Sequence, residues 1–386
     1  MSRQLRTSLL LIALSIALIG CNGGIEITPT PTRVVLATLP PTPTLTAEEY
    51  YVQGEVHFLA GEYAAALAEY DRALAINPDD AVTLNRRGQA HSRLGDIQAA
   101  IADFNAALAV APAYVPALNN RGLTYQRLGD IISALQDYNH AIEIAPQDPA
   151  AYYNRGILYQ ATGQTEQAIA DYTTVLDLDP DNATALLSRG LAWAALGNYP
   201  SAVLDYNRAL QLEPENANLY NNRGFAFYQM GAVPDAIEDY TEAIALDPAY
   251  PQVFLNRALA FNDDAQYDEA LADIGTYLSF VPDDPTAIHL QGVVYVNMGE
   301  DERALSACST AIALDPRIAS AACCIRSMVS PGSPFRIIYA LSRSKPIPSP
   351  SCSPSSNWKP SATSTPDQRC RLTITMLVKT SAPPRN

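Results

Sequence analysis

Lysine is missing from the first 344 residues of this 386-residue chain, and all three lysines fall near its end: Lys345, Lys359 and Lys379. Up to residue 318 the sequence has 16 basic residues against 39 acidic residues, a net charge of −23. Residues 319–386 have 9 basic residues against 1 acidic residue, a net charge of +8. Nucleic-acid binding needs clustered cations that neutralise phosphates. The acidic body of the chain therefore argues against nucleic acid as a partner.

Cysteine is absent over the 286 residues between Cys21 and Cys308, so no disulfide framework and no C-x-x-C metal pair serves the main body. The chain has four histidines, and it contains none of the motifs G-x-x-x-x-G-K-[ST], H-E-x-x-H, G-x-S-x-G and G-x-G-x-x-G. His57 and His91 take places that aromatic residues fill elsewhere, which indicates packing, and His140 stands alone. We therefore expect no catalytic residues, no metal site, no cofactor and no small-molecule substrate.

The N-terminus has the pattern of a secretion signal. Arg3 and Arg6 precede an apolar run from about Leu9 to Ile19, which is too short to span a bilayer comfortably. The run ends in "LIGC", which resembles the lipobox of bacterial lipoproteins, whose cysteine receives diacylglycerol and becomes the mature N-terminus. The resemblance implies a signal peptide over 1–21, lipid attachment at Cys21 and an extracytoplasmic location on a bacterial membrane, inner or outer. The alternative is an ordinary cleaved signal peptide in which Cys21 has no role.

Residues 22–46 are predicted to form a tether. Between Thr28 and Thr46 the chain has seven threonines, five prolines and a single charged residue, Arg33. Such a segment buries no core, and its prolines favour an extended polyproline II conformation. At about 3.1 Å per residue it would hold the rest of the chain up to roughly 75 Å from a membrane. A proline-rich recognition ligand is the alternative.

From residue 47 the sequence repeats every 34 residues, and three residue types recur in phase over eight periods, which defines a repeat protein. The glycines are Gly54, Gly88, Gly122, Gly156, Gly190, Gly224 and Gly292, with Ala258 in the remaining place. The prolines are Pro78, Pro112, Pro146, Pro180, Pro214, Pro248, Pro282 and Pro316. The alanines are Ala66, Ala100, Ala134, Ala168, Ala202, Ala236, Ala270 and Ala304.

Each unit is predicted to form two helices. In the third unit, Gly122 and Tyr125 fall at helical spacing, and Gly129 ends the first helix. Asp130 is placed to cap the second helix, and Pro146 ends it. The apolar stripe of the second helix consists of Ala134, Leu135, Tyr138, Ala141 and Ile142.

This pattern resembles the tetratricopeptide repeat, whose signature includes G-x2-Y, A-x3-F and a terminal proline. The resemblance covers residues 47–318 as eight units, although other residues, such as Tyr50 and Leu118, replace the early tryptophan of the family. It implies an all-α fold, a right-handed superhelical solenoid of eight 34-residue helix-turn-helix repeats. The first helices would line a concave groove and the second helices would form the convex back. Stability would then be shared between neighbouring units, with no single central core.

One position departs from the family pattern. The residue before the glycine is arginine in units two to seven, and an aspartate follows it sixteen residues later. The arginines are Arg87, Arg121, Arg155, Arg189, Arg223 and Arg257, and the aspartates are Asp103, Asp137, Asp171, Asp205, Asp239 and Asp273. The end units lose both residues, with Gln53 and Glu69 in the first and Gln291 and Ala307 in the last. We predict a structural Arg–Asp ladder that joins first and second helices, within a unit or between neighbours.

Asparagines dominate the positions that the resemblance assigns to the concave groove. An asparagine amide both donates and accepts hydrogen bonds, so a row of them can pair with the backbone of an extended peptide. The predicted partner-binding residues are Asn85, Asn119, Asn120, Asn154, Asn221, Asn222, Asn256, Arg93, Arg127, Tyr153 and Tyr228. His289 is predicted to face the same groove, with no partner at ligand spacing. The partner would be a peptide or helix of another protein; alternatively, the asparagines only solvate an idle face.

The repeat stops at residue 318. Residues 319–386 are rich in serine and proline, and they lack a convincing polar capping helix of the kind that a solenoid end usually needs. They are either a disordered basic tail or the product of a frameshift near codon 317. Together these features predict a non-catalytic protein–protein interaction scaffold, lipid-anchored at a bacterial membrane surface. The alternative is an accessory subunit of an envelope enzyme or of a glycan or secretion assembly, in which the partner carries out catalysis.

Overall fold

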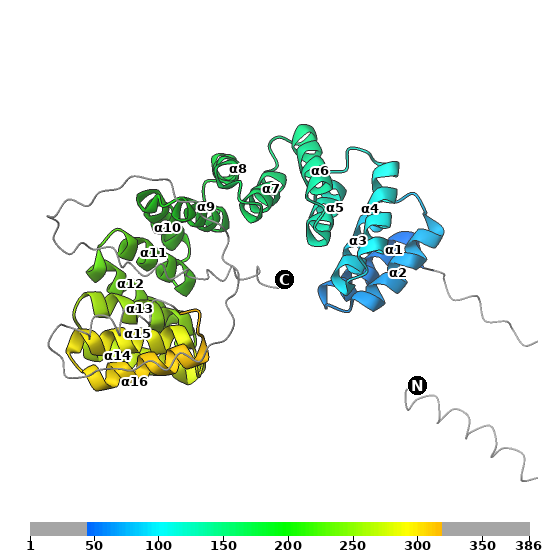
Figure 1. Cartoon of the computed structure of the whole chain (residues 1–386). Helices are drawn as coiled ribbons and strands as arrows, with labels where there is room; N and C mark the ends of the chain where they lie inside the picture. Colours follow the sequence, from blue (N-terminus) through cyan, green and yellow to red (C-terminus); the bar gives the residue numbers. More distant parts are fainter. Residues whose placement is uncertain (1–44, 319–386) are drawn as a thin grey trace, which may run out of the picture. The chain divides into compact units, whose positions relative to one another are not determined.

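The computed structural model describes residues 45–318, and all the regular secondary structure in this range is helical. Sixteen helices follow one another in chain order (Figure 1). The first helices of the eight units are α1 (Ala47–Leu59), α3 (Ala81–Leu94), α5 (Val115–Leu128), α7 (Pro149–Ala161), α9 (Ala183–Ala195), α11 (Ala217–Gln229), α13 (Pro251–Asp263) and α15 (Pro285–Met298). The second helices are α2 (Tyr63–Ile76), α4 (Ile97–Val110), α6 (Ile131–Ile144), α8 (Thr165–Leu178), α10 (Tyr199–Leu212), α12 (Val233–Leu246), α14 (Tyr267–Phe280) and α16 (Asp301–Leu314). The predicted all-α superhelical solenoid of eight 34-residue units is confirmed.

The remaining sequence predictions fall elsewhere. The lipid-attachment cysteine Cys21, the signal peptide, nearly all of the tether and the segment 319–386 lie outside the described residues. None of the described helices is both long and apolar enough to span a membrane.

The turn inside each unit uses a left-handed residue. Gly129 follows α5 with φ 84°, and Asp130 then accepts a 3.1 Å hydrogen bond from the backbone N–H of Ser133, as the predicted helix cap. In the seventh unit Ala265 occupies the turn with φ 59°. A residue with a Cβ is strained in this conformation, so the turn geometry is imposed by the packing of the two helices.

The helices pack mainly on their neighbours in the chain. Every helix contacts the next one, both within a unit and across the boundary to the following unit. Neighbouring first helices also contact each other from α3 to α15, whereas no neighbouring pair of second helices within 45–318 makes comparable contacts. Because the first helices lie closer together than the second helices, they form the inner side of the solenoid.

Within a unit, a glycine allows the two helices to approach closely. A Cβ on Gly122 of α5 would lie 2.6 Å from the ring carbon Cε1 of Tyr138 of α6, closer than real contacts permit. Most other units repeat this pair of a glycine and an aromatic ring. In the seventh unit Ala258 replaces the glycine, and the aromatic ring is replaced by Ile274. The smaller side chain makes room for the added methyl group.

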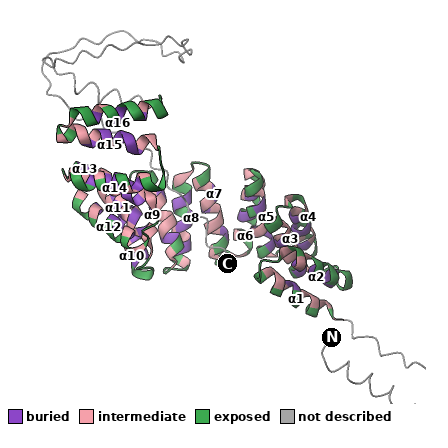
Figure 2. Cartoon of the chain, turned by 90° about the horizontal axis from the view of Figure 1, so that it is seen from below, coloured by how far each residue is buried: buried purple, intermediate pink, exposed green. Residues whose placement is uncertain are grey.

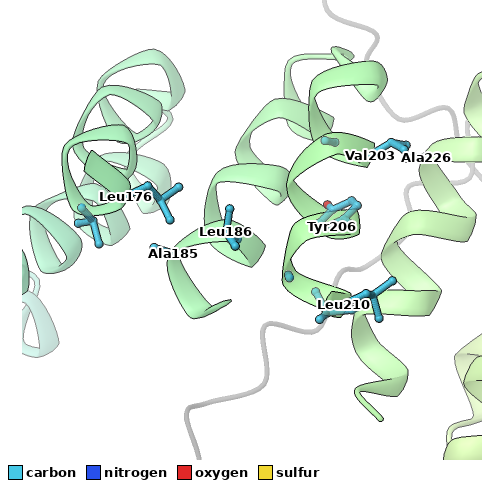
Figure 3. Close-up of a cluster of buried hydrophobic side chains, with 11 residues drawn as sticks. Leu176, Ala185, Leu186, Val203, Tyr206, Leu210 and Ala226 are labelled. Carbon is cyan, nitrogen blue, oxygen red and sulfur yellow. The ribbon is translucent and has the colours of Figure 1, made fainter. Parts of the chain in front are cut away.

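The core is distributed along the solenoid. Buried residues occur on every helix rather than around one centre, as the purple segments in Figure 2 show. One cluster joins Leu176 of α8, Leu186 of α9, Tyr206 and Leu210 of α10, and Ala226 of α11 (Figure 3). Each second helix thus packs between its own first helix and the next one, which is the nearest-neighbour stabilisation typical of repeat proteins.

Candidate protein-binding surface

The predicted Arg–Asp ladder is present in units two to seven, and each pair lies within one unit. Arg155 of α7 donates from Nε to Oδ2 of Asp171 of α8 at 2.9 Å, and from Nη2 to Oδ1 at 2.7 Å. The other five pairs have the same bidentate geometry, which is the strongest form of ion pair between these side chains. The pairs are Arg87–Asp103, Arg121–Asp137, Arg189–Asp205, Arg223–Asp239 and Arg257–Asp273. The aspartates are buried.

Each ladder arginine also has a third contact that the sequence analysis did not predict. Nη1 of Arg155 donates to Oδ1 of Asn139, on the second helix of the preceding unit. The equivalent acceptors of the other arginines are Asp71, Asn105, Thr173, Asn207 and Thr241. All six stand sixteen residues before their arginine, so the signal was visible in the sequence. We call each arginine with its two acceptors a clamp, since it joins three helices.

Aromatic rings complete the surroundings of several clamps. The Arg155 guanidinium lies 5.7 Å from the ring centroids of both Tyr152 and Tyr159, a separation suited to cation–π attraction. The hydrogen bonds that Arg155 donates to Asp171 raise the pKa of Arg155. The guanidinium is therefore held charged, and it fixes the position of its first helix between the second helices of its own unit and of the preceding unit.

The seven asparagines that were predicted to bind a partner are less accessible than expected. Asn85, Asn119, Asn221 and Asn256 are buried, so the expectation that all seven asparagines present open amides is wrong for these four. The physical reason is the close approach of neighbouring first helices. Asn120 donates to Oδ1 of Asn85 at 2.9 Å, and Asn256 donates to Oδ1 of Asn221 at 2.9 Å.

The remaining predicted residues lie at the surface. Asn120, Asn154 and Asn222 are half-buried, and Arg93 and Arg127 are exposed. Arg127 donates to the backbone oxygen and Oγ of Ser92, at 2.9 and 2.8 Å. Two half-buried tyrosines also reach the next unit: Tyr153 bonds Ser188 at 3.2 Å and Tyr228 donates to Asp263 at 2.5 Å. These contacts place Arg127, Tyr153 and Tyr228 between adjacent first helices, on the inner side, and Asn154, Asn222 and Arg93 occupy equivalent places in the 34-residue repeat.

His289 does not face an open groove as predicted. It is 2 % exposed, and neither ring nitrogen has a hydrogen-bond partner among the described residues. Burial lowers its pKa, so the imidazole is neutral at physiological pH. At the same place two other units have leucine, Leu187 and Leu255, and three have the buried asparagines Asn85, Asn119 and Asn221.

An apolar column on the inner side was missed by the sequence analysis. It consists of the residues directly after the repeat glycine or its alanine replacement: Leu123, Ile157, Leu191, Phe225, Leu259 and Val293. Each lies three or four residues from a side chain that hydrogen-bonds a neighbouring first helix, and so lies on the same face of its helix. Leu123, for example, lies three residues after Asn120 and four residues before Arg127. All six side chains remain partly accessible, and Leu123 is 38 % exposed. The 34-residue spacing would have revealed the column.

Charge is distributed unevenly along this face. Arg93 and Arg127 lie at its N-terminal half, whereas Asp263 lies in its C-terminal half. Arg86 pairs with Glu55 at 3.1 Å and so adds little net charge. Within residues 45–318 no group of three His, Cys, Asp or Glu side chains has the arrangement of a metal site. The inner face therefore offers an apolar column, three half-buried amides and two cations.

Four family models describing the tetratricopeptide repeat match the chain, at residues 53–119, 114–181, 153–217 and 226–264. Together these matches span more than half of the chain and most of the solenoid. A comparison with curated proteins finds no match.

Several solved structures are similar to this chain. The chain is similar to a tetratricopeptide repeat protein from Parabacteroides merdae, with 22% identity and a TM-score of 0.47 over 64% of this chain and 98% of that one. It is also similar to the APC/C hetero-tetramer Cut9–Hcn1, with 18% identity and a TM-score of 0.50 over 73% of this chain and 55% of that one. YrrB, a tetratricopeptide repeat protein with an unusual peptide-binding site, matches with 24% identity and a TM-score of 0.44, over 49% of this chain and 97% of that chain. The family matches and the eight helix-turn-helix units together show that this chain belongs to the tetratricopeptide repeat proteins.

Proposed function

We propose that the chain is a non-catalytic interaction scaffold that binds a peptide or helix of another protein along its inner face. The tetratricopeptide fold implies a protein-interaction scaffold. The observation that carries the finer proposal is the apolar column. Six partly accessible apolar side chains repeat along adjacent first helices, although a solvated face would favour polar residues there.

The amides and cations beside the column suit a protein ligand. Asn154 and Asn222 are half-buried, and their amides can pair with a peptide backbone whatever its sequence. Arg93 makes no ion pair among the described residues. The partner segment would place apolar side chains on the column and an acidic end near Arg93.

We further propose that a lipid on Cys21 holds the scaffold at an extracytoplasmic membrane surface of a bacterium. The support is the sequence alone: an apolar run of suitable length that ends at Cys21, followed by a Pro/Thr-rich tether. Fatty-acid labelling and membrane fractionation of the wild type beside Cys21→Ser test it. Loss of both label and membrane attachment in the variant is expected, and retention of both would refute the anchor.

Site-specific photo-cross-linking in cells tests the inner face. A photoreactive residue is placed at Asn154 or at Asn222, and the matched control carries it at Leu204, which is 70 % exposed on second helix α10. We expect discrete protein adducts from the first two positions and none of these adducts from Leu204. The identity of the adduct then separates a scaffold from an accessory subunit of an envelope enzyme.

A second set of variants ties the adducts to the column. Leu191→Ala with Phe225→Ala should abolish them, whereas Ile132→Ala with Leu204→Ala, two exposed apolar residues on second helices, should leave them unchanged. Circular dichroism confirms that each variant is folded. Identical adducts from all positions, or adducts that survive loss of the column, would contradict the proposed binding face.

A further inference from the structure

Helix α1 has an exposed face. The equivalent face of every later first helix is covered. Two residues beyond the repeat glycine, seven units bury a side chain: Ala90, Thr124, Leu158, Ala192, Ala226, Ala260 and Val294. The preceding second helix covers it, as Ala66 and Tyr70 of α2 pack with Ala90 of α3. In α1, the first of the described helices, the same place is Val56, which is 62 % exposed.

The open face is apolar. Val52, Val56 and Leu59 fall four and three residues apart, so they form one stripe along α1, and they are 53, 62 and 83 % exposed. Gly54 is the only buried residue of this helix. The end of a solenoid normally carries a polar outer face. An apolar stripe there favours coverage by another surface over exposure to water.

The stripe does not suit a further second helix of the repeat type. Seven residues before the Val56 place, the other units bury a small or apolar residue or a threonine: Thr83, Ala117, Ala151, Ala185, Leu219, Val253 and Ala287. In α1 this residue is Glu49, whose carboxylate accepts hydrogen bonds from Thr46 in a capping box. A repeat-type helix across this face would bury that carboxylate without a cation, at a high desolvation cost. This argues against head-to-tail stacking of copies and against a foreign repeat hairpin.

We propose that α1 pairs with α1 of a second copy of this chain, antiparallel about a two-fold axis at Val56. An interface of this symmetry needs a patch that is complementary to itself. The stripe has this property, since Val52 lies four residues before Val56 and Ala60 lies four residues after it. The pair brings Val56 against its own counterpart and Val52 beside Ala60 of the second copy. Glu49 then lies at the rim, in contact with solvent.

The charges around the stripe favour the antiparallel arrangement. In the antiparallel pair, Glu48 and Glu49 at the start of α1 lie beside the C-terminal end of α1 of the second copy, so they do not face the same carboxylates of that copy. A parallel pair would set each glutamate against itself.

Sedimentation velocity of the full chain tests the dimer. A single helix pair buries less than the roughly 800 Å² per partner of a standard interface, so we expect a dissociation constant of about 10–100 µM. The wild type should pass from monomer to dimer as its concentration rises and go no further. Val56→Glu should remain monomeric, whereas Leu204→Glu, an equal change at an exposed residue of α10, should dimerise like the wild type. Melting curves followed by circular dichroism establish that both variants fold.

A charge-swap experiment locates the axis. Val56→Glu and Val56→Lys should each be monomeric, and an equimolar mixture should form the dimer again, because the two substituted residues meet only across a two-fold axis at Val56. A wild type that stays monomeric throughout, assembly that grows beyond the dimer, dimerisation of Val56→Glu, or a mixture that stays monomeric would each overturn the proposal. A monomer would favour a foreign helix as the occupant, and growth without limit would favour head-to-tail stacking.

Discussion

Each clamp arginine is held at the residue scale by one aspartate and one short polar side chain. Asp171 is buried and accepts two hydrogen bonds from Arg155. Without it, the half-buried guanidinium would retain Asn139 as its one hydrogen-bond acceptor among the described residues. We expect Asp171→Ala to lower the free energy of unfolding by about 3 kcal/mol, because removal of one partner leaves a charge uncompensated. The urea and thermal unfolding midpoints measure this loss.

The control for this change is Asp177→Ala on the same helix. Asp177 is exposed, and we expect a change within about 0.5 kcal/mol. Equal melting temperatures for Asp171→Ala and the wild type would show that the clamp does not stabilise the solenoid.

His289 gives the last unit a dependence on pH. Burial depresses its pKa in the folded chain, whereas an unfolded histidine titrates near about 6.5. Below that pH the unfolded state binds a proton that the folded state does not, so stability is present above about pH 6.5 and is lost as the pH falls. We expect His289→Leu to flatten the decline in melting temperature between about pH 7 and pH 5. His140→Leu, at an exposed histidine, should keep the slope of the wild type; the same slope in both variants would contradict this account.

At the scale of the helical element, a glycine and a ring set the distance between the two helices of a unit. Gly122→Ala would place a methyl group 2.6 Å from Tyr138. We expect a loss of about 2 kcal/mol from this overpacking, although alanine is the better helix former. The double variant Gly122→Ala with Tyr138→Ile should recover part of that loss, since the seventh unit combines Ala258 with Ile274. Urea unfolding of the single and double variants measures the coupling.

Gly275→Ala is the matched control for the clash. Gly275 lies inside α14, and a Cβ there would meet nothing within 4 Å. This change should raise stability by about 0.5–1 kcal/mol through helix propensity alone. If both glycine changes lowered stability, the contact with the Tyr138 ring would not explain the loss in Gly122→Ala.

The elements were predictable because their signals are local and repeated. Gly129, Asp130 and Pro146 mark where one helix stops and the next begins, and the structure follows them. The pairing of Arg155 with Asp171 was also predictable from the shared spacing. Its bond to Asn139 was not predicted, although short polar residues stand at the same spacing before each arginine.

The inner face was harder to predict than the helices. The burial of Asn85 depends on how closely α3 and α5 approach, which is a property of tertiary packing and not of the local pattern. The apolar column was overlooked because a residue such as Leu191 also fits the core stripe of an amphipathic helix. His289 was misplaced for the same reason as Asn85.

At the scale of the whole solenoid, stability should fall toward its two ends. Units two to seven each have a clamp, whereas Gln53 and Gln291 replace the arginine in the end units. The stability of a repeat protein comes from its single repeats and from contacts between nearest neighbours. The absence of a clamp therefore lowers stability locally. We expect amide protons of α8 and α10 to exchange more slowly than those of α1, α2 and α16. Hydrogen exchange read by mass spectrometry measures this, and uniform protection along the helices would contradict it.

The clamps also bear on how such a chain changes its length. Every clamp reaches sixteen residues forward and sixteen residues back, so each junction between inner units has the same chemistry. If residues 149–182 were removed, Arg189 would meet Asn139 in place of Thr173, and one short polar acceptor would replace another. If an inner unit were duplicated, the new boundary between units would likewise have an arginine with an acceptor sixteen residues before it and sixteen residues after it. A gene of this kind can gain or lose whole repeats in one step, and the reach of its inner face can vary between descendants while the joints stay the same.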